Sequence, residues 1–332
     1  MNAFAVNCNV KKPSFSPLHA QKVQNGDIVR LNIDLQNPSE EVIMEPLFDT
    51  QGEVVMKVGH GGHLPGLHEM VVGMEVGDTI ENMSIDAGYG AANPDAIATL
   101  PWSNVDESIR SGIKVGVELF VGSGQKVRVT EVTDDTFTID ANPPLAGSSY
   151  KCKSVKVLDI VEEESLEVAT VALGCFWGGE LAYMREPGVI STKVGYTQGS
   201  KENPSYKEVC TGTTGHTEAI QIIFDPAVVT YERIIQLGLD RLGDSKYLLN
   251  QVGNDRGTQY RHGVYYHNDE QRSKAEKILA DVPISSIDGS KCQTELKLAS
   301  IFYDAEDYHQ QYLLKGGQSA KKNAEETIRC YG

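Results

Sequence analysis

Residues 167–189 read EVATVALGCFWGGELAYMREPGV, and this stretch decides the fold of the second half of the chain. An apolar run ends at Gly174, and a pattern typical of a helix begins directly after Cys175. We therefore predict a buried strand, a tight turn and a helix that starts at Cys175. Unpaired backbone N–H groups and the helix dipole at such a position stabilise a thiolate. Cys175 is the leading candidate for a reactive residue, and the alternative is a buried structural thiol.

Downstream of this stretch, the apolar periodicity alternates between that of strands and that of helices. Strands that alternate with helices are typical of an α/β or α+β domain. We therefore expect one such domain in the second half of the chain. The predicted strands are 218–226, 262–268 and 294–302, and the predicted helices are 229–242 and 269–282.

The first half of the chain consists of short β-like runs separated by glycine-rich turns. Residues 92–146 carry small alternating strands of their own, and the strand predicted at 150–161 returns to the first sheet. Residues 92–146 therefore read as an insertion, and the fold class is two-domain α+β. The predicted units are a flexible leader at 1–21, a first domain at 22–161, a linker at 162–167 and a second domain at 168–332.

The composition limits the possible partners. The chain has 332 residues with 46 acidic and 30 basic side chains, so its formal net charge is −16. Such a surface repels nucleic acid and anionic lipid, and we expect neither partner. No stretch approaches the ~20 apolar residues of a membrane-spanning helix, and residues 1–15 lack the pattern of a signal peptide, so we expect a cytoplasmic protein. The cysteines and histidines lack zinc spacing, and we expect no metal.

Four further blocks follow GCFWGG (174–179) along the chain. They are NPSYKEVCTGTTGHTE (203–218), GNDRGTQYR (253–261), FYDAEDYHQQYL (302–313) and GQSAKKNAEETIRCYG (317–332). In order and spacing, the five blocks resemble those of the A-type peptide methionine sulfoxide reductases over residues 168–332. The resemblance implies an α/β domain with a ferredoxin-like core, no bound cofactor, and thioredoxin or another dithiol as the reductant.

The resemblance also implies a set of site residues. A carboxyl kept neutral by an apolar pocket can give a proton to the sulfoxide oxygen, and phenol hydroxyls can hydrogen-bond that oxygen as charge develops. Aromatic rings can contact the methyl group of the substrate. The residues at the family's positions are the nucleophile Cys175, the acid Glu218, the tyrosines Tyr206 and Tyr260, the aspartate Asp255, the aromatic pair Phe176 and Trp177, and the resolving cysteine Cys330.

The implied reaction is the reduction of methionine-S-sulfoxide in proteins. Cys175 becomes a sulfenic acid, condenses with Cys330 to a disulfide, and is recycled by thioredoxin. The chain departs from the family at Asn323, where many relatives carry another cysteine, and in the loop 241–249. Cys210 and Cys292 read as ordinary thiols, and His309 reads as a hydrogen-bonded packing residue.

Residues 25–161 carry a second resemblance. The stretches 47–78, 85–95 and 141–160 resemble an FKBP-type prolyl isomerase of the SlyD-like kind, whose flap is replaced by an inserted chaperone subdomain at 92–146. The implied fold is an antiparallel half-barrel with an apolar pocket that twists a desolvated X–Pro bond. A binding module without isomerase activity is the alternative. The implied pocket residues are Phe48, Asp49, Val54, His63, Leu64, Leu67 and Tyr89.

Together the two resemblances predict a repair enzyme for oxidised or unfolded proteins, in which a tethered module raises the local substrate concentration. Two other classes of function fit the sequence. One is a chaperone with a vestigial reductase, for which Cys175→Ser would change nothing. The other is a thiol hydrolase or general disulfide enzyme that uses Cys175 with His216, and it would hydrolyse esters or amides.

Overall fold

The computed structural model describes residues 21–36, 47–87, 90–121, 126–143, 145–162 and 165–329. We call the described residues up to 162 the N-terminal part and residues 165–329 the C-terminal part. The predicted leader lies almost entirely outside the described residues. Within the described ranges no helix is both long and apolar enough to span a lipid bilayer.

The N-terminal part is built on a four-stranded antiparallel sheet in the order β2-β1-β8-β3. Buried and exposed residues alternate along β8, as expected of a strand with one face on a core. A short helix, α1, begins at Pro65, whose fixed φ suits the first helical position. The bounds are β1 Ile28–Gln36, β2 Gln51–Lys57, α1 Pro65–Val71, β3 Thr79–Asp86 and β8 Ser149–Val161.

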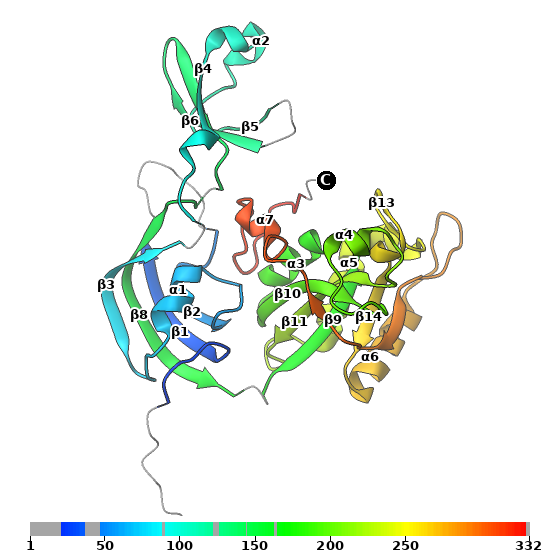
Figure 1. Cartoon of the computed structure of the whole chain (residues 1–332). Helices are drawn as coiled ribbons and strands as arrows, with labels where there is room; N and C mark the ends of the chain where they lie inside the picture. Colours follow the sequence, from blue (N-terminus) through cyan, green and yellow to red (C-terminus); the bar gives the residue numbers. More distant parts are fainter. Residues whose placement is uncertain are drawn as a thin grey trace, which may run out of the picture.

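A second antiparallel sheet, in the order β4-β7-β6-β5, lies between β3 and β8 in the sequence. It has its own small core around Val129, Phe137 and Ile139, and it projects away from the rest of the molecule (Figure 1). Its helix α2 is capped by Asp106, which accepts a hydrogen bond from the amide of Ser108 at 2.9 Å. The bounds are β4 Ile97–Pro101, α2 Glu107–Arg110, β5 Glu118–Phe120, β6 Lys126–Val132 and β7 Thr136–Asp140.

The C-terminal part has a six-stranded mixed sheet in the order β15-β14-β9-β11-β10-β16. Only the β14–β15 pair is parallel among these described strands. The strand bounds are β9 Glu167–Leu173, β10 Val189–Thr197, β11 Thr217–Phe224, β14 His262–Tyr266, β15 Glu295–Leu298 and β16 Tyr303–Asp304, with a separate hairpin of β12 Gln251–Val252 and β13 Asp255–Arg256. The helix bounds are α3 Phe176–Arg185, α4 Tyr206–Cys210, α5 Tyr231–Leu242, α6 Asp269–Asp281 and α7 Tyr312–Lys315.

The predicted strand, turn and helix around residue 175 are confirmed by β9 and α3. Helix α3 lies close to the sheet because Gly179 has no side chain. A Cβ atom at this position would lie 2.5 Å from Cδ1 of Ile220 in β11. The close approach places the start of α3 beside the end of β11 that carries Glu218.

The two parts share apolar packing. One core of the C-terminal part lies between its sheet and α5, and it includes Val171, Ile222 and Ile235. The core of the N-terminal part continues into the C-terminal part through side chains of α3, α7 and the residues that follow α7. The C-terminal contributors are Leu181, Met184, Leu313, Leu314 and Ala320. Trp177 packs against both cores.

Candidate active site

Cys175 lies at the junction of β9 and α3, as the N-cap residue of the helix. Gly174 before it has a φ of +75°, which favours glycine, and a Cβ atom there would lie 2.6 Å from Cβ of Val252. This turn leaves Cys175 half-buried, and it forms no disulfide with another described cysteine. Its side chain therefore lies at the positive end of a helix dipole, where a thiolate is stabilised.

Glu218 is the buried carboxyl of the site. Its Oε2 atom accepts a hydrogen bond from the backbone N–H of Phe176 at 3.1 Å. Phe176 directly follows Cys175, so the carboxyl lies close to the cysteine. The side chain is almost fully buried. Burial raises the pKa of Glu218 to about 8, against the opposing effect of the Phe176 amide and with a further upward contribution from Asp255. The carboxyl is therefore mainly protonated at neutral pH and can donate a proton.

Tyr206, Tyr260 and Asp255 lie around the same carboxyl. Burial raises the pKa of Tyr260, and the charges of Glu218, Asp255 and Cys175 raise it further. Burial also raises the pKa of Tyr206, and the charges of Glu218 and Tyr260 raise this pKa further. Both phenols therefore keep their protons and can act as hydrogen-bond donors. The structure brings together these residues, which the sequence analysis predicted as a site.

An aromatic cluster forms one side of the site. Phe176 is buried against Tyr196 and His309, with ring centroids 6.1 and 5.3 Å away. The indole N–H of Trp177 donates to Nδ1 of His309 at 3.2 Å, and its ring stacks on Tyr312 at 4.0 Å. His309 is thus buried and hydrogen-bonded, and its predicted role as a packing residue is confirmed. The cluster offers apolar surface for a methyl group.

Glu306 was not predicted, and it holds two residues of the site in place. Its carboxylate accepts hydrogen bonds from the backbone N–H of Tyr206 and from the hydroxyl of Tyr196, both at 2.9 Å. Burial is the largest single contribution and raises the pKa of Glu306. The hydrogen bonds together outweigh it, so the pKa lies below its usual value. The only sequence signal was an acidic residue inside the block 302–313.

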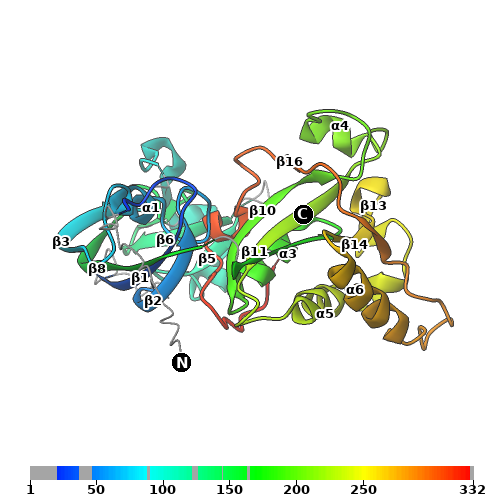
Figure 2. The ribbon, with the colours of Figure 1, turned by 90° about the horizontal axis from the view of Figure 1, so that it is seen from below.

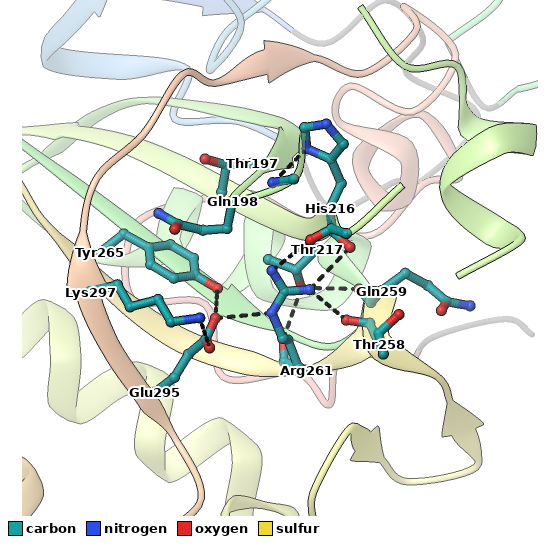
Figure 3. A network of polar contacts seen from close by, with 12 residues as sticks. Thr197, Gln198, His216, Thr217, Thr258, Gln259, Arg261, Tyr265, Glu295 and Lys297 are labelled. Carbon is teal, nitrogen blue, oxygen red and sulfur yellow. Dashed lines mark hydrogen bonds and ion pairs between the residues drawn. The ribbon is translucent and has the colours of Figure 1, made fainter. Parts of the chain in front are cut away.

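Arg261 is a second unpredicted residue, and it joins two loops of the site (Figure 3). Its guanidinium donates to the carbonyl oxygens of Gly215, His216 and Thr258 at 3.0, 3.1 and 2.8 Å. Its Nε atom donates to Glu295 at 3.0 Å. Residues 215–216 lead directly into β11, which carries Glu218, and Thr258 lies in the same turn as Tyr260, so Arg261 ties the two site residues together.

The ring of His216 does not serve Cys175 as a base. Its Nδ1 atom accepts from the amide of Gly199 at 3.3 Å, and its Nε2 atom lies 2.8 Å from the carbonyl oxygen of Lys201. Both nitrogen atoms are therefore engaged by backbone groups. This arrangement argues against the thiol hydrolase considered above.

The residues predicted for the second pocket lie in the N-terminal part, away from Cys175. Phe48, His63, Leu64 and Leu67 are buried, whereas Asp49 and Val54 are half-buried. His63 accepts from the amide of Leu64 and donates through Nε2 to the carbonyl oxygen of Asp49 at 2.9 Å, and burial lowers its pKa. The predicted residues Tyr89 and Cys330 lie outside the described residues.

Comparisons with known proteins concern the C-terminal part. The family described as "Peptide methionine sulfoxide reductase" matches residues 167–329. A peptide methionine sulfoxide reductase of Solanum lycopersicum is 48% identical over 180 residues, which cover 53% of this chain and 90% of that protein. Peptide methionine sulfoxide reductase A2-1 of Oryza sativa subsp. japonica is 45% identical over 193 residues, which cover 58% and 99%.

Solved structures are similar over the same half. The methionine sulfoxide reductase A of Corynebacterium diphtheriae is 34% identical, covers 46% of this chain and 75% of its own, and gives a TM-score of 0.43. The reduced form of Mxr1 from Saccharomyces cerevisiae is also 34% identical, with coverage of 48% and 90% and the same TM-score. By the identity of its C-terminal half with the Solanum lycopersicum and Oryza sativa proteins, this chain belongs to the peptide methionine sulfoxide reductase family.

Proposed function

We propose that the C-terminal part reduces methionine-S-sulfoxide in oxidised proteins with Cys175 as the nucleophile. One observation carries this assignment: a buried carboxyl with a raised pKa, Glu218, is hydrogen-bonded to the amide next to Cys175. A sulfoxide is a poor electrophile until its oxygen receives a proton. The site therefore holds a nucleophile and a proton donor side by side.

In the proposed first step the thiolate of Cys175 attacks the sulfoxide sulfur while Glu218 protonates the oxygen. The hydroxyls of Tyr206 and Tyr260 hydrogen-bond this oxygen, and Phe176 and Trp177 contact the methyl group. The oxygen passes to the cysteine, so methionine leaves and Cys175 becomes a sulfenic acid. The substrate sulfur is reduced, the cysteine sulfur is oxidised, and Asp255 helps to keep Glu218 protonated.

In the proposed second step the thiol of Cys330 condenses with the sulfenic acid and releases water. The resulting Cys175–Cys330 disulfide is reduced by thioredoxin or another dithiol, which returns both thiols. This step rests on the family resemblance of the block 317–332.

The test of both steps is the variant Cys330→Ser. We expect it to reduce about one equivalent of methionine sulfoxide per chain, because the first step needs only Cys175, and to stop there with thioredoxin as reductant. Mass spectrometry of the stalled protein should find the oxidised Cys175. Cys292→Ser is the matched control and should turn over normally. Full thioredoxin-driven turnover by Cys330→Ser would contradict the assignment of the resolving thiol.

We also propose that the N-terminal part is an FKBP-type, SlyD-like prolyl isomerase domain, with the boundaries predicted above. The antiparallel sheet with α1 against it and the buried group Phe48, Leu64 and Leu67 support this proposal. Most of the described side chains of the predicted pocket are apolar, apart from Asp49 and His63, and an apolar lining favours desolvation of an X–Pro bond.

The inserted sheet is proposed to bind unfolded protein segments. Large apolar side chains are more than half exposed on this sheet and on the helix and turn beside it, at Ile109 of α2 (59%), Val115 (58%) and Phe120 of β5 (62%). Contiguous exposed apolar residues mark interaction surfaces. A chain that captures unfolded segments would then present buried methionine sulfoxides to the reductase site in the same cytoplasmic protein.

Refolding of a proline-limited protein tests the N-terminal proposal. We expect the full chain to accelerate the slow phase and Phe48→Leu to reduce this effect, because Phe48 forms part of the predicted pocket. Ile109→Ser combined with Phe120→Ser should lower the affinity for an unfolded protein and leave turnover of free methionine sulfoxide unchanged. Absence of acceleration by the full chain at concentrations at which it binds a proline-containing peptide would contradict the isomerase assignment.

A further inference from the structure

The pocket predicted in the N-terminal part adjoins the C-terminal part of the same chain. Phe48, Leu64 and Leu67 are only 2%, 0% and 0% exposed. They belong to one continuous core with side chains of α3, α7 and residue 320. A pocket that acts on peptides needs an accessible apolar surface, and here the C-terminal part packs against the core that holds the pocket residues.

The packing includes residues 318–329, which we call the tail segment. The amide of Ala320 donates to the carbonyl oxygen of Leu47 at 2.8 Å. Two residues later, the amide of Lys322 donates to the carboxylate of Asp49 at 3.3 Å. The carbonyl oxygen of Leu47 and the carboxylate of Asp49 thus form one edge that accepts hydrogen bonds from backbone amides, and the amides of a peptide substrate can donate to the same two acceptors. The tail segment passes between the two parts of the molecule (Figure 2).

The tail segment is also fixed to the end of α3. Arg185 donates through Nε to the carbonyl oxygen of Ser319 at 2.8 Å and through Nη1 to that of Glu326 at 2.6 Å. The ammonium group of Lys322 donates to the carbonyl oxygens of Met184 and Val189, both at 2.7 Å. The segment therefore has one face toward the C-terminal part and one toward Leu47 and Asp49.

Space remains beside the tail segment. A cleft of about 290 Å³ is lined by Asp49, Val54 and His63 from the N-terminal part and by Met184 and Ile190 from the C-terminal part. Three of the predicted pocket residues thus face the boundary between the parts. A peptide that entered the pocket fully would meet the tail segment at Leu47 and Asp49.

We propose that the tail segment is the resident ligand of the N-terminal pocket, and that an extended proline-containing peptide competes with it for the edge at Leu47–Asp49. This inference rests on the proposed isomerase function. The peptide binds the pocket only in the fraction of molecules in which the tail segment has left, so its apparent affinity is lowered by that fraction. Binding of a protein substrate and docking of the tail segment are mutually exclusive.

The first test is Ala320→Arg. Ala320 is 7% exposed in the shared core, so an arginine cannot be accommodated while the segment is docked. We expect the full-length variant to bind the tetrapeptide Ala-Leu-Pro-Phe about tenfold more tightly than the wild type, measured by calorimetry. Glu325→Arg, on the exposed side of the same segment, is the matched control and should bind like the wild type. Equal affinities for all three proteins would overturn the proposal.

The second test needs no variant. Hydrogen exchange of the amides of Ala320 and Lys322 is measured in the full wild-type chain with and without saturating Ala-Leu-Pro-Phe. We expect exchange at both amides to become at least about tenfold faster with the peptide, because their acceptors lie on the competed edge. Ala-Leu-Ala-Phe is the control peptide and should leave exchange unchanged. Peptide binding with unaltered protection of these amides would overturn the proposal.

The two levels of the proposal fail differently. If neither the wild type nor Ala320→Arg binds the proline peptide, the isomerase assignment of the N-terminal part is wrong, and the competition falls with it. If both bind with the same affinity, the isomerase assignment stands and only the role of the tail segment is wrong.

Discussion

The two parts of the chain build their sites in different ways. In the C-terminal part, reactive groups are held by directed polar contacts, such as the bond from the Phe176 amide to Glu218 and the three carbonyl bonds of Arg261. In the N-terminal part, most of the predicted pocket residues belong to an apolar core, which side chains of the other part such as Leu181 and Leu313 extend. A polar site is thus defined within its own domain, whereas an apolar pocket depends on what packs against it.

The largest expected effect concerns the carboxyl of the reductase site. In Glu218→Gln the bond from Phe176 is kept but the proton donor is lost, so we expect kcat/KM for a peptide sulfoxide to fall by roughly 10²–10⁴. In the wild type, activity should decline as the pH rises through about 8, because Glu218 then loses its proton. This decline should be absent in the residual activity of Glu218→Gln, and its persistence there would assign it to another group.

Glu180 on α3 is the matched control, since burial also raises its pKa to about 8 and it accepts from the amide of Gln311 at 2.8 Å. Glu180→Gln should retain the decline in activity near pH 8. Both carboxyls hold a proton in the folded state and lose it near pH 4.5 in the unfolded state. The unfolding free energy therefore falls with rising pH from about 4.5 to about 8, and each glutamine variant should weaken this fall in urea titrations.

The next effect concerns the core that the two parts share. Leu67 is fully buried, so Leu67→Ala should lower the free energy of unfolding by about 2–5 kcal/mol, measured by urea denaturation. Because this core includes Leu181 and Met184 of α3, reductase activity and the N-terminal sheet should be lost in the same transition. Val72→Ala, at a 45% exposed position just after α1, should cost less than about 0.5 kcal/mol. Reductase activity that survived unfolding of the N-terminal sheet would show that the cores are independent.

The smallest effect concerns the loops of the reductase site. Arg261→Lys keeps the charge beside Glu295 but loses the forked contacts to the carbonyl oxygens, and we expect a cost of about 1–2 kcal/mol in stability. Loosening of the loops should also lower kcat/KM for the sulfoxide. Arg272→Lys, in an exposed pair with Glu276, should cost no more than about 0.5 kcal/mol. Unchanged stability and activity in Arg261→Lys would show that other contacts hold the loops.

The candidate residues of the reductase site could be predicted because they lie in short sequence motifs. Cys175, Glu218 and Tyr260 each lie in such a motif, and strong local signals place Cys175 between a strand and a helix. The supporting contacts were not predictable. Glu306 and Arg261 act on residues far away in the sequence, and neither has a local pattern that reveals its partners.

The surroundings of the second pocket could not be predicted for a similar reason. The block KKN at 321–323 has the composition of a solvated tail, yet Lys322 donates to carbonyl oxygens at the end of α3. The last carbonyls of a helix need donors from elsewhere, and only the fold shows which residue supplies them. Phe48 and Leu67 likewise share their core with Leu181 and Met184 of α3, more than a hundred residues along the chain.

The two tryptophans of the chain lie in contrasting places. The indole of Trp177 touches both cores and stacks on Tyr312, so any separation of the two parts alters its surroundings. Trp102 lies in the inserted sheet, where it packs on Phe137 and donates to the carbonyl oxygen of Thr133. The fluorescence of Trp177 would therefore report separation of the two parts. Trp102 would add a constant background, which the variant Trp102→Phe removes.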